Sequence, residues 1–390
     1  MRWPPYFSSM QAMAVRKKIF VALSGGVDSS VAAALLKKRG FDVHGIHINM
    51  WSPKDSYPLP AASSPHDTVC RQQYQDRLDA MRVAVKLDIP FQTWDFTDEY
   101  RRAVVDYMIR EYADGRTPNP DMMCNRHIKF GLFLKRALEL GADYVATGHY
   151  VRKSETHSAS SGRANPKSQI QNLKLLIAKD ANKDQSYFLW TLAQKQLRHC
   201  LFPIGEYTKP EVRALARRYG LPTAVKPDSQ GICFIGEINI REFLMRYIPE
   251  RRGRVLTTAG GVVGEHGGAE FYTIGQRRGL GIGGGIPYYV AEKNVAANTI
   301  TVAEGPYDGT LFQKELVATD VNWILDEKPK FPLRCEARIR YRQPLQTCSI
   351  ERIGDNRVGV MFDESQRAIT PGQSIVFYRD EEMLGGGIIA

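Results

Sequence analysis

Cysteines, long apolar runs and acidic residues near the N-terminus are scarce in this sequence of 390 residues. Six cysteines are too few for a disulfide-stabilised secreted scaffold. No two of them are three residues apart, so the CxxC pattern of zinc, redox and many iron–sulfur sites is absent. We therefore expect a reducing compartment, in which a functional cysteine acts as a thiol.

The chain has no apolar run of the ~18 residues that a membrane-spanning helix needs, which predicts no membrane association. No acidic residue precedes Asp28, whereas several basic residues do. That start could be a short transit peptide, but it is poor in Arg and has no apolar h-region. An extended or misplaced start is the simpler interpretation, because Met10 and Met13 both precede the first predicted strand. The cytoplasm is the expected location, and the mitochondrial matrix is the alternative.

Positive charge is in excess: 53 Lys and Arg residues against 42 Asp and Glu residues give a net charge of +11. An excess of this size favours a polyanionic partner such as a nucleic acid. The length predicts two or three domains, at roughly 150 residues per domain.

Short apolar runs alternate with helical patterns in the N-terminal half. The run at 19–23 leads through a Gly- and Ser-rich turn into a helix that ends near Gly40. Further helices are expected at 77–87, 98–112 and 129–140, and strands at 41–48, 91–96 and 143–147. This alternation predicts an α/β fold with a doubly wound parallel sheet.

After residue 243 the helical periodicity fades and short strands dominate, which predicts two smaller β-rich domains. Three strands of the second are expected at 334–344, 357–362 and 374–378. Residues 52–66 and 154–172 have the composition of loops. The predicted divisions are an N-terminal extension (1–17), a catalytic domain (18–242), a central β-rich domain (243–306) and a C-terminal domain resembling a β-barrel (307–390).

The segment SGGVDSS, residues 24–30, is the strongest local signal. Its glycines let the backbone fold closely around an anion. Ser24, Ser29 and Ser30 supply hydroxyl donors, and the following helix directs its free N–H groups at a phosphate. The spacing matches neither a Walker A loop nor GxGxxG. A structural glycine–serine turn is the alternative interpretation.

This segment resembles the PP-loop of the ATP pyrophosphatases, which split ATP between its α and β phosphates to adenylate a substrate. Five further segments, GRTPNPDMMCN (115–125), TGHY (147–150), KDQSYFLW (183–190), DSQGICFIGE (228–237) and TIGQRRGLGIGG (273–284), occur in the order found in the tRNA-specific 2-thiouridylases. The chain closely resembles that family, which converts the wobble uridine (position 34) of certain tRNAs to 2-thiouridine.

The resemblance implies ATP, with Mg²⁺, as cosubstrate. The implied ATP-binding residues are Ala22, Leu23, Ser24, Gly25, Gly26, Val27, Asp28, Ser29, Ile48 and Gly148. At position 48 the family often has Met, whose backbone contacts adenine. A backbone contact tolerates Ile48, while Met50 lies two places further on. No metal-binding residue is predicted.

Thiolation needs two activations. The uracil C2 oxygen is a poor leaving group until AMP is attached to it, and sulfur must arrive without free sulfide escaping. The resemblance implies that Cys124 is the nucleophile, that Cys233 carries a persulfide, and that the two form a transient disulfide by thiol–disulfide exchange. Asp121 precedes Cys124 by three residues and would suit an acid/base one helical turn away. The remaining four cysteines are expected to be small buried hydrophobes.

The resemblance also implies a set of tRNA-contacting residues, in which the first three face the target uridine: Asn119, Pro120, Asp121, His149, Lys183, Asp184, Gln185, Arg340, Tyr341 and Gln373. A structural role for His149 is equally compatible with the sequence. Arg338, Arg340 and Arg342 alternate, so a strand would place all three on one face. Such residues could neutralise phosphates or stack on unpaired bases.

Three other functions compete with this one. A PP-loop ligase that forms amides or amidines on a small molecule would leave the cysteine motifs without a role. An inactive RNA-binding protein would not need an intact PP-loop, Asp121 and both cysteines. An iron–sulfur thiolation enzyme would need a CxxC.

The sulfur donor is expected to be a separate persulfide-carrying protein, because nothing in the chain resembles a desulfurase. The chain itself is expected to be a monomer.

Overall fold

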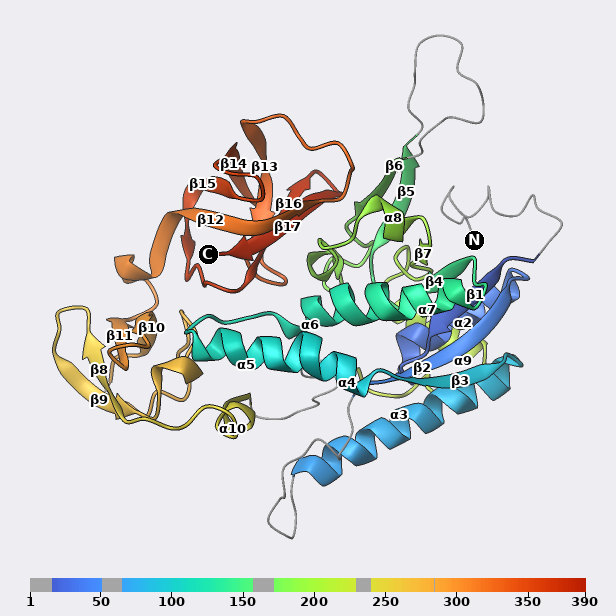
Figure 1. Cartoon of the computed structure of the whole chain (residues 1–390), viewed down its shortest axis with the longest axis horizontal. Coiled ribbons are helices and arrows are strands. Elements are labelled where there is room, and N and C mark those ends of the chain that lie inside the picture. The colour runs from blue at the N-terminus through green and yellow to red at the C-terminus, as the bar shows by residue number, and fades with distance from the viewer. Residues whose placement is uncertain (1–15, 51–64, 157–171, 229–239, 284) are drawn as a thin grey trace.

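The computed structural model describes residues 16–50, 65–156, 172–228, 240–283 and 285–390, with side chains omitted at 65–71 and 156. Five parallel strands form the sheet of the N-terminal part, in the order β3-β2-β1-β4-β7 (Figure 1). Their bounds are Lys18–Ala22 (β1), Asp42–Asn49 (β2), Phe91–Asp95 (β3), Tyr144–Ala146 (β4) and Cys200–Leu201 (β7). The predicted doubly wound α/β fold is therefore confirmed.

The central strand of this sheet explains why a short apolar run is sufficient. Ile19, Phe20 and Val21 of β1 are each at most 2% exposed, because β1 pairs with β2 on one side and β4 on the other. The strand order reverses between β1 and β4, since the chain leads outward from β1 to β3 before it returns to β4. Open α/β sheets bind ligands at the carboxyl ends of the strands at such a reversal. The turn that follows β1 lies at this point.

The helices are α2 (Val27–Lys38), α3 (Pro65–Leu87), α4 (Thr97–Tyr100), η3 (Arg101–Val105), α5 (Asp106–Ala113), α6 (Pro120–Met123), η4 (Cys124–Phe133), α7 (Leu134–Glu139), η5 (Ser186–Phe188), α8 (Gln194–Leu197), α9 (Lys209–Arg218) and α10 (Ile240–Leu244). The helices expected at 98–112 and 129–140 are parts of two longer helical rods. The first rod runs from α4 through α5 (residues 97–113), and the second runs from α6 through α7 (residues 120–139). In each rod a π-helical segment, η3 or η4, joins two α-helical ones. The rods lie side by side and extend from the sheet toward the β-rich part (Figure 1).

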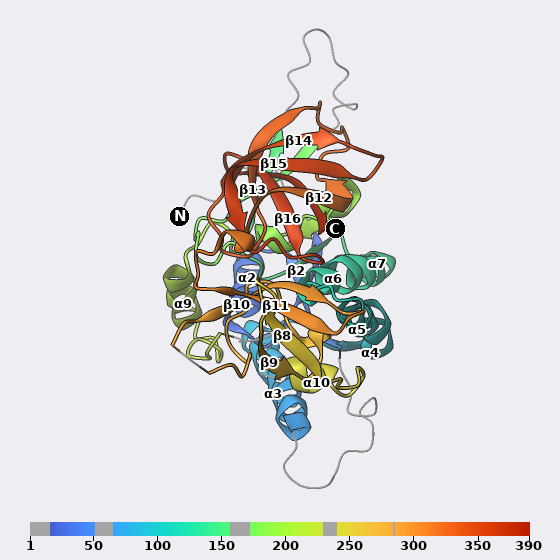
Figure 2. The same cartoon turned by 90° about the vertical axis from the view of Figure 1, so that its left-hand side faces the viewer.

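The central β-rich domain contains a four-stranded sheet in the order β10-β11-β8-β9. Its elements are β8 (Gly253–Thr257), β9 (Val262–His266), η6 (Ala269–Phe271), β10 (Tyr288–Asn294) and β11 (Thr299–Glu304). Figure 2 shows this sheet below the C-terminal domain, which confirms that the β-rich part has two separate sheets.

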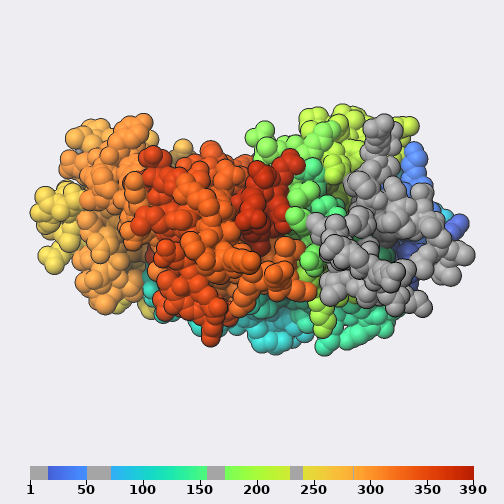
Figure 3. Space-filling model, turned by 90° about the horizontal axis from the view of Figure 1, so that it is seen from above, coloured from blue at the N-terminus to red at the C-terminus, as the bar shows by residue number. Residues whose placement is uncertain are grey.

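Six antiparallel strands form a closed barrel at the C-terminus, in the order β12-β15-β14-β13-β16-β17, and β12 pairs with β17. The bounds are η7 (Gly309–Leu311), β12 (Phe312–Trp323), β13 (Leu333–Arg338), β14 (Gln346–Arg352), β15 (Val358–Arg367), β16 (Ser374–Arg379) and β17 (Glu382–Ile389). The barrel lies between the central domain and the α/β domain in the view of Figure 3.

A hairpin from the α/β part joins the barrel sheet. β5 (Arg152–Thr156) pairs with β6 (Asn172–Leu176), and β6 pairs with β17. The predicted loop at 154–172 therefore begins and ends in strands. The predicted loop at 52–66 lies outside the described residues, apart from its last two, which begin α3.

The strand expected at 334–344 is too long. β13 ends at Arg338, and the chain has left the strand before Arg342, whose backbone is in the left-handed region with φ +64°. Arg338, Arg340 and Arg342 consequently do not share a strand face. Within the described residues, no helix is long and apolar enough to span a bilayer.

Candidate active site

The Gly- and Ser-rich turn connects the end of β1 to the start of α2. Gly25 has φ +78°, and a Cβ atom there would lie 2.1 Å from the backbone oxygen of Asp76 in α3. Any other residue would therefore clash with backbone as well as strain its own conformation. Gly148, which follows β4, is similarly confined, because its Cβ would lie 2.6 Å from the backbone nitrogen of Ser29. Two glycines thus let three backbone segments meet around the start of α2.

The start of α2 is open to an anion. The first N–H groups of any α-helix have no intrahelical acceptor, and the N-cap residue here, Gly26, offers them no side-chain acceptor either. Ser24 is exposed, and its hydroxyl lies 3.1 Å from that of Ser29. Ser30 differs from the expectation, because its buried hydroxyl donates to the Gly26 carbonyl at 2.7 Å and serves the helix itself.

Other predicted ATP-binding residues surround this turn. Leu23 is buried, and its N–H donates to the Ile46 carbonyl at 2.8 Å, so the strand pairing extends to the edge of the turn. Ile48 lies near the end of β2, the neighbouring strand, and is 6% exposed. Ala22 ends β1 and Val27 begins α2. The fold therefore brings the ends of β1, β2 and β4 together.

Asp121 and Cys124 lie on the same helical rod. Asn119 is its N-cap, and the side-chain oxygen of Asn119 accepts a hydrogen bond from the N–H of Met122 at 3.2 Å. Pro120 occupies the first helical position, where its missing N–H costs nothing. Asp121 follows in the first turn, and Cys124 begins the π-helical segment. The helical spacing predicted for the acid and the thiol is present.

The Cys124 thiol is fully buried. Its side chain is 0% exposed, and its Sγ lies 3.7 Å from the Sδ of Met50, just beyond β2. Burial, which outweighs the opposing charge of Lys129 and is assisted by the charge of Asp121, raises the pKa of the Cys124 thiol to about 12. The described conformation therefore holds Cys124 as a protonated thiol rather than as a thiolate.

Cys233 and its GICFIG motif lie in 229–239, outside the described residues. Three of the four cysteines expected to be small buried hydrophobes, Cys200, Cys335 and Cys348, are buried. The side chain of the fourth, Cys70, lies outside those that the structure describes. Cys335 and Cys348 lie directly opposite each other on β13 and β14, with their sulfurs 3.8 Å apart.

The predicted tRNA-contacting residues of the KDQ segment make contacts within the protein. Lys183 forms an ion pair with Asp228 at 2.6 Å. Asp184 is 1% exposed and accepts hydrogen bonds from both the N–H and the hydroxyl of Ser186. Gln185 exchanges hydrogen bonds with the backbone of Tyr150, at 2.8 and 3.0 Å.

His149 is enclosed in the same region. Its Nδ1 lies 2.8 Å from the Thr147 hydroxyl, and its ring packs against Phe130 and Phe202. Burial, followed by the charge of Lys129, lowers the pKa of His149 well below its usual value, so the ring is neutral. Its surroundings are those of a structural histidine.

The remaining predicted tRNA contacts lie where domains meet. Arg340 donates to the carbonyls of Ile274 in the central domain and Ala368 in the barrel, at 3.2 and 2.9 Å. Gln373 of the barrel donates to the carbonyls of Thr117 and Pro118, just before Asn119, at 2.8 and 3.2 Å. Tyr341 packs against Phe188 with ring centroids 4.7 Å apart. These side chains join the barrel to the helical rods and to the central domain.

Comparison with known proteins identifies the family. Residues 17–237 match the model of the tRNA methyl transferase HUP domain, residues 241–304 that of the tRNA methyl transferase PRC-barrel domain, and residues 313–389 that of the aminomethyltransferase beta-barrel domain. The tRNA-specific 2-thiouridylase MnmA of Marinomonas sp. is 44% identical over 96% of this chain and 91% of its own. The chain belongs to the tRNA-specific 2-thiouridylase family.

Other relatives agree with this assignment. The tRNA-specific 2-thiouridylase MnmA 2 of Geobacillus kaustophilus is 45% identical over 95% of this chain and 94% of its own. The corresponding protein of Shigella boydii is 44% identical over 96% of both chains. The resemblance to tRNA-specific 2-thiouridylases inferred from the motifs is thus confirmed along nearly the whole chain.

Sequence analysis missed several charged residues beside the PP-loop of this 2-thiouridylase family member. On α9, Lys209 pairs with both Asp28 and Asp228, and Arg213 pairs with Asp228. Asp228 is part of a quoted motif, but neither α9 residue lies in one, and only the fold brings α9 to the start of α2. Within the described ranges, no group of three His, Cys, Asp or Glu side chains could hold a metal ion.

Proposed function

We propose that this protein is an ATP-dependent tRNA-uridine 2-sulfurtransferase that thiolates the wobble uridine, position 34. Its near full-length similarity to tRNA-specific 2-thiouridylases carries this proposal. The open start of α2 beside Asp28 and the Asp121–Cys124 rod supply the two halves of the chemistry that it requires.

In the first step, the uracil C2 oxygen attacks the α phosphate of ATP and pyrophosphate leaves. The N–H groups at the start of α2 and the Ser24 hydroxyl are suited to hold phosphate oxygens, because the helix start has no side-chain cap and Ser24 is exposed. Ile48 and Gly148, at the ends of neighbouring strands, would border the nucleotide. Magnesium would arrive with ATP, since Mg²⁺ is commonly held by substrate phosphates and one or two carboxylates.

In the second step, the terminal sulfur of a Cys233 persulfide displaces AMP at C2. The Cys124 thiolate then attacks the Cys233 sulfur, forms the Cys124–Cys233 disulfide and leaves the remaining sulfur on the base as 2-thiouridine. A thiol reductant reduces the disulfide, and a separate persulfide-carrying protein recharges Cys233. Each exchange needs a thiolate as the attacking species.

The burial of Cys124 constrains this mechanism. A thiol with a pKa of about 12 provides almost no thiolate at neutral pH, so substrate binding must move it to a less buried position. Asp121 lies at the start of the same rod and belongs to the segment proposed to contact the uridine. Movement of the rod start would therefore bring base, acid and thiol together.

The RNA contacts proposed for Lys183, Arg340, Tyr341 and Gln373 would come from a surface that runs from the PP-loop to the barrel. The side chains of Arg340 and Gln373 are only partly buried, although each holds a domain contact. An RNA that binds along this surface would span all three domains. Domain divisions at residues 17/18, 242/243 and 306/307, and a monomeric state, belong to the same proposal.

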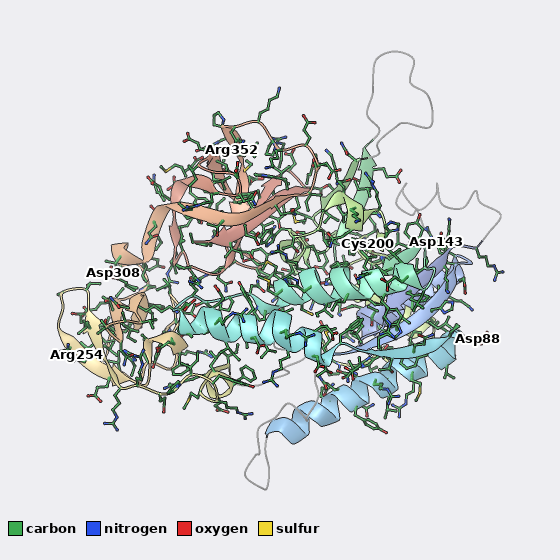
Figure 4. All side chains as sticks on the ribbon, in the orientation of Figure 1. Asp88, Asp143, Cys200, Arg254, Asp308 and Arg352 are labelled. Atoms are coloured by element: carbon green, nitrogen blue, oxygen red, sulfur yellow. The ribbon has the colours of Figure 1, made fainter. Side chains whose placement is uncertain are left out.

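The direct test is a thiolation assay. Purified full-length protein is incubated with ATP, magnesium, a persulfide source and unmodified tRNA, and the digested tRNA is examined for 2-thiouridine by mass spectrometry. The parent should form product, and Cys124→Ser and Cys233→Ser should form none. Cys200→Ala is the matched control, because Cys200 lies among packed side chains in the α/β domain and not on the helical rod (Figure 4).

Two results would contradict the proposal. If the parent makes pyrophosphate from ATP but no thionucleoside, a PP-loop ligase acting on a small molecule becomes the better assignment. If both cysteine variants retain product, the sulfur chemistry does not involve these thiols.

A further inference from the structure

Five charged side chains form a compact cluster beside the first turn of α2. The α2 charge cluster consists of Asp28, Lys183, Lys209, Arg213 and Asp228. The Lys209 ammonium lies 2.8 Å from Asp28 and 2.8 Å from Asp228. Asp228 also pairs with Lys183 at 2.6 Å and with Arg213 at 2.7 Å. Three cations therefore share two carboxylates, which leaves one positive charge in excess.

The cluster is built from four separate segments of the chain. Asp28 lies in the first turn of α2, Lys209 and Arg213 lie one turn apart on α9, Lys183 precedes η5, and Asp228 follows α9. The Lys209 side chain is only 11% exposed, so its charge is directed inward rather than to bulk water. The Tyr150 hydroxyl donates to Asp28 Oδ1 at 2.8 Å, and the same oxygen accepts a hydrogen bond from Lys209.

The two more exposed pairs of the cluster, Lys183–Asp228 and Arg213–Asp228, add little to the stability of the fold. Partly exposed ion pairs contribute only ~0–1 kcal/mol each to stability. Here the cations border the uncapped start of a 12-residue helix, where the helix dipole already favours an anion. The Asp228 carboxylate is an anion in the apo protein, because hydrogen bonds from Lys183 and Lys209 outweigh burial and lower its pKa to about 2.

We propose that Lys209 and Arg213 bind the β and γ phosphates of ATP, and that Asp228 forms ion pairs with both side chains until the nucleotide displaces it. This inference rests on the proposed use of ATP and names binding residues outside the PP-loop. A polyphosphate carries several negative charges and many acceptor oxygens, whereas a carboxylate carries one charge. The nucleotide therefore replaces Asp228 on Arg213 and Lys209, while Asp28 and Tyr150 keep Lys209 in position.

Direct binding measurements on the full-length protein test the inference without relying on thiolation. Dissociation constants for Mg–ATP, inorganic pyrophosphate and AMP are measured by calorimetry on the parent, Lys209→Gln, Arg213→Gln and Asp228→Asn. Arg217→Gln is the matched control, because Arg217 lies on the exposed side of the same helix. Circular dichroism establishes that each variant is folded.

Lys209→Gln and Arg213→Gln should each weaken ATP and pyrophosphate by at least about tenfold, or about 1.4 kcal/mol, and leave AMP unchanged. Asp228→Asn should tighten ATP and pyrophosphate several-fold, because it removes the competing anion. A merely structural Asp228 predicts the opposite sign. The inference is overturned if folded Lys209→Gln binds pyrophosphate as the parent does, or if Asp228→Asn weakens ATP.

The same data separate this inference from the proposed function. A parent that binds pyrophosphate through Lys209 but makes no 2-thiouridine supports the cluster and contradicts the 2-sulfurtransferase. If the parent makes 2-thiouridine while the Lys209 and Arg213 variants bind ATP as the parent does, the 2-sulfurtransferase is supported and the role of the cluster is contradicted. A parent that binds neither ATP nor pyrophosphate contradicts both.

Discussion

Cys124 is a nucleophile candidate that the apo protein keeps protonated. Burial raises its pKa to about 12, well above the ~8.5 of an exposed thiol, so its thiolate fraction at pH 8 should be lower by on the order of a thousandfold. We expect iodoacetamide to label Cys124 far more slowly in the folded protein than in urea, with a labelling rate that still rises between pH 8 and 10. Peptide mass spectrometry after timed quenching measures both rates.

The matched comparison is Cys124 in the presence of ATP and tRNA, which should accelerate labelling if substrate binding moves the rod start. Rapid labelling in the apo protein, with a plateau below pH 9, would show that the thiol is already accessible and activated.

Which residues the sequence identifies depends on how local their role is. Gly25 was predictable, because a phosphate turn between a strand and a helix is a feature of consecutive residues. Lys209 was not, because its partners Asp28 and Asp228 lie 181 and 19 positions away and nothing in its own segment signals them. His149 belongs to a recognisable motif, yet only the fold shows that aromatic rings enclose it.

Secondary-structure elements, like single residues, were predictable where their pattern is local and not where long-range contacts decide. Four of the five parallel strands were predicted, and β1 most clearly, because a strand buried on both faces needs apolar residues throughout. The two-residue strand β7, Cys200–Leu201, was not predicted, because so short a run gives no pattern. The alternating arginines predicted a continuation of β13 that does not exist. Arg338 is buried and pairs with Asp184 at 3.4 Å, and Arg340 turns to contact the central domain. Alternation therefore arose from two separate long-range contacts and not from an exposed strand face.

β5 carries a lysine whose charge state depends on pH near neutrality. Lys153 is 8% exposed and donates to the carbonyls of Leu197 and Cys200 at 2.9 and 2.7 Å. Burial lowers its pKa to about 7, whereas the unfolded chain should titrate near about 10.4. Between these values the unfolded state binds the extra proton, so this group's contribution to stability rises with pH from about 7 to about 10 and is flat below 7.

Urea denaturation of the parent and Lys153→Met at pH 6, 7, 8 and 9 measures this contribution. The difference in midpoint between the two proteins should shift in favour of the parent as pH rises above 7. Lys195→Met, at an exposed position on the nearby α8, should show no such trend. Midpoints of parent and Lys153→Met that run parallel across the series would exclude a depressed pKa.

At the scale of the whole molecule, the segment formed by residues 184–192 connects the PP-loop to the barrel. Gln185 holds Tyr150, whose hydroxyl contacts Asp28, and the adjacent Asp184 holds Arg338 of the barrel. A few residues later, Tyr187 donates to the Ser374 carbonyl at 2.8 Å. The position of the barrel is therefore linked to the PP-loop through hydrogen bonds and an ion pair of this segment. The basic central domain extends outward beyond them, where the exposed Arg254 lies (Figure 4).

The barrel is fastened to this segment chiefly through backbone carbonyls. Asn322 of β12 donates to the carbonyls of Trp190 and Leu192 at 2.7 and 3.0 Å, and Gly386 of β17 has no room for a Cβ, which would lie 2.7 Å from the Trp190 ring.

Asn322→Ala leaves two carbonyls without this donor, so we expect the free energy of unfolding to fall by about 1–3 kcal/mol. Because the barrel also orders the segment beside Asp28, the variant should bind ATP more weakly as well. Calorimetric unfolding and ATP titration measure the two effects, with Gln313→Ala, an exposed change on the same strand, as the control. A loss of stability with unchanged ATP affinity would show that the nucleotide site does not depend on how the barrel is seated.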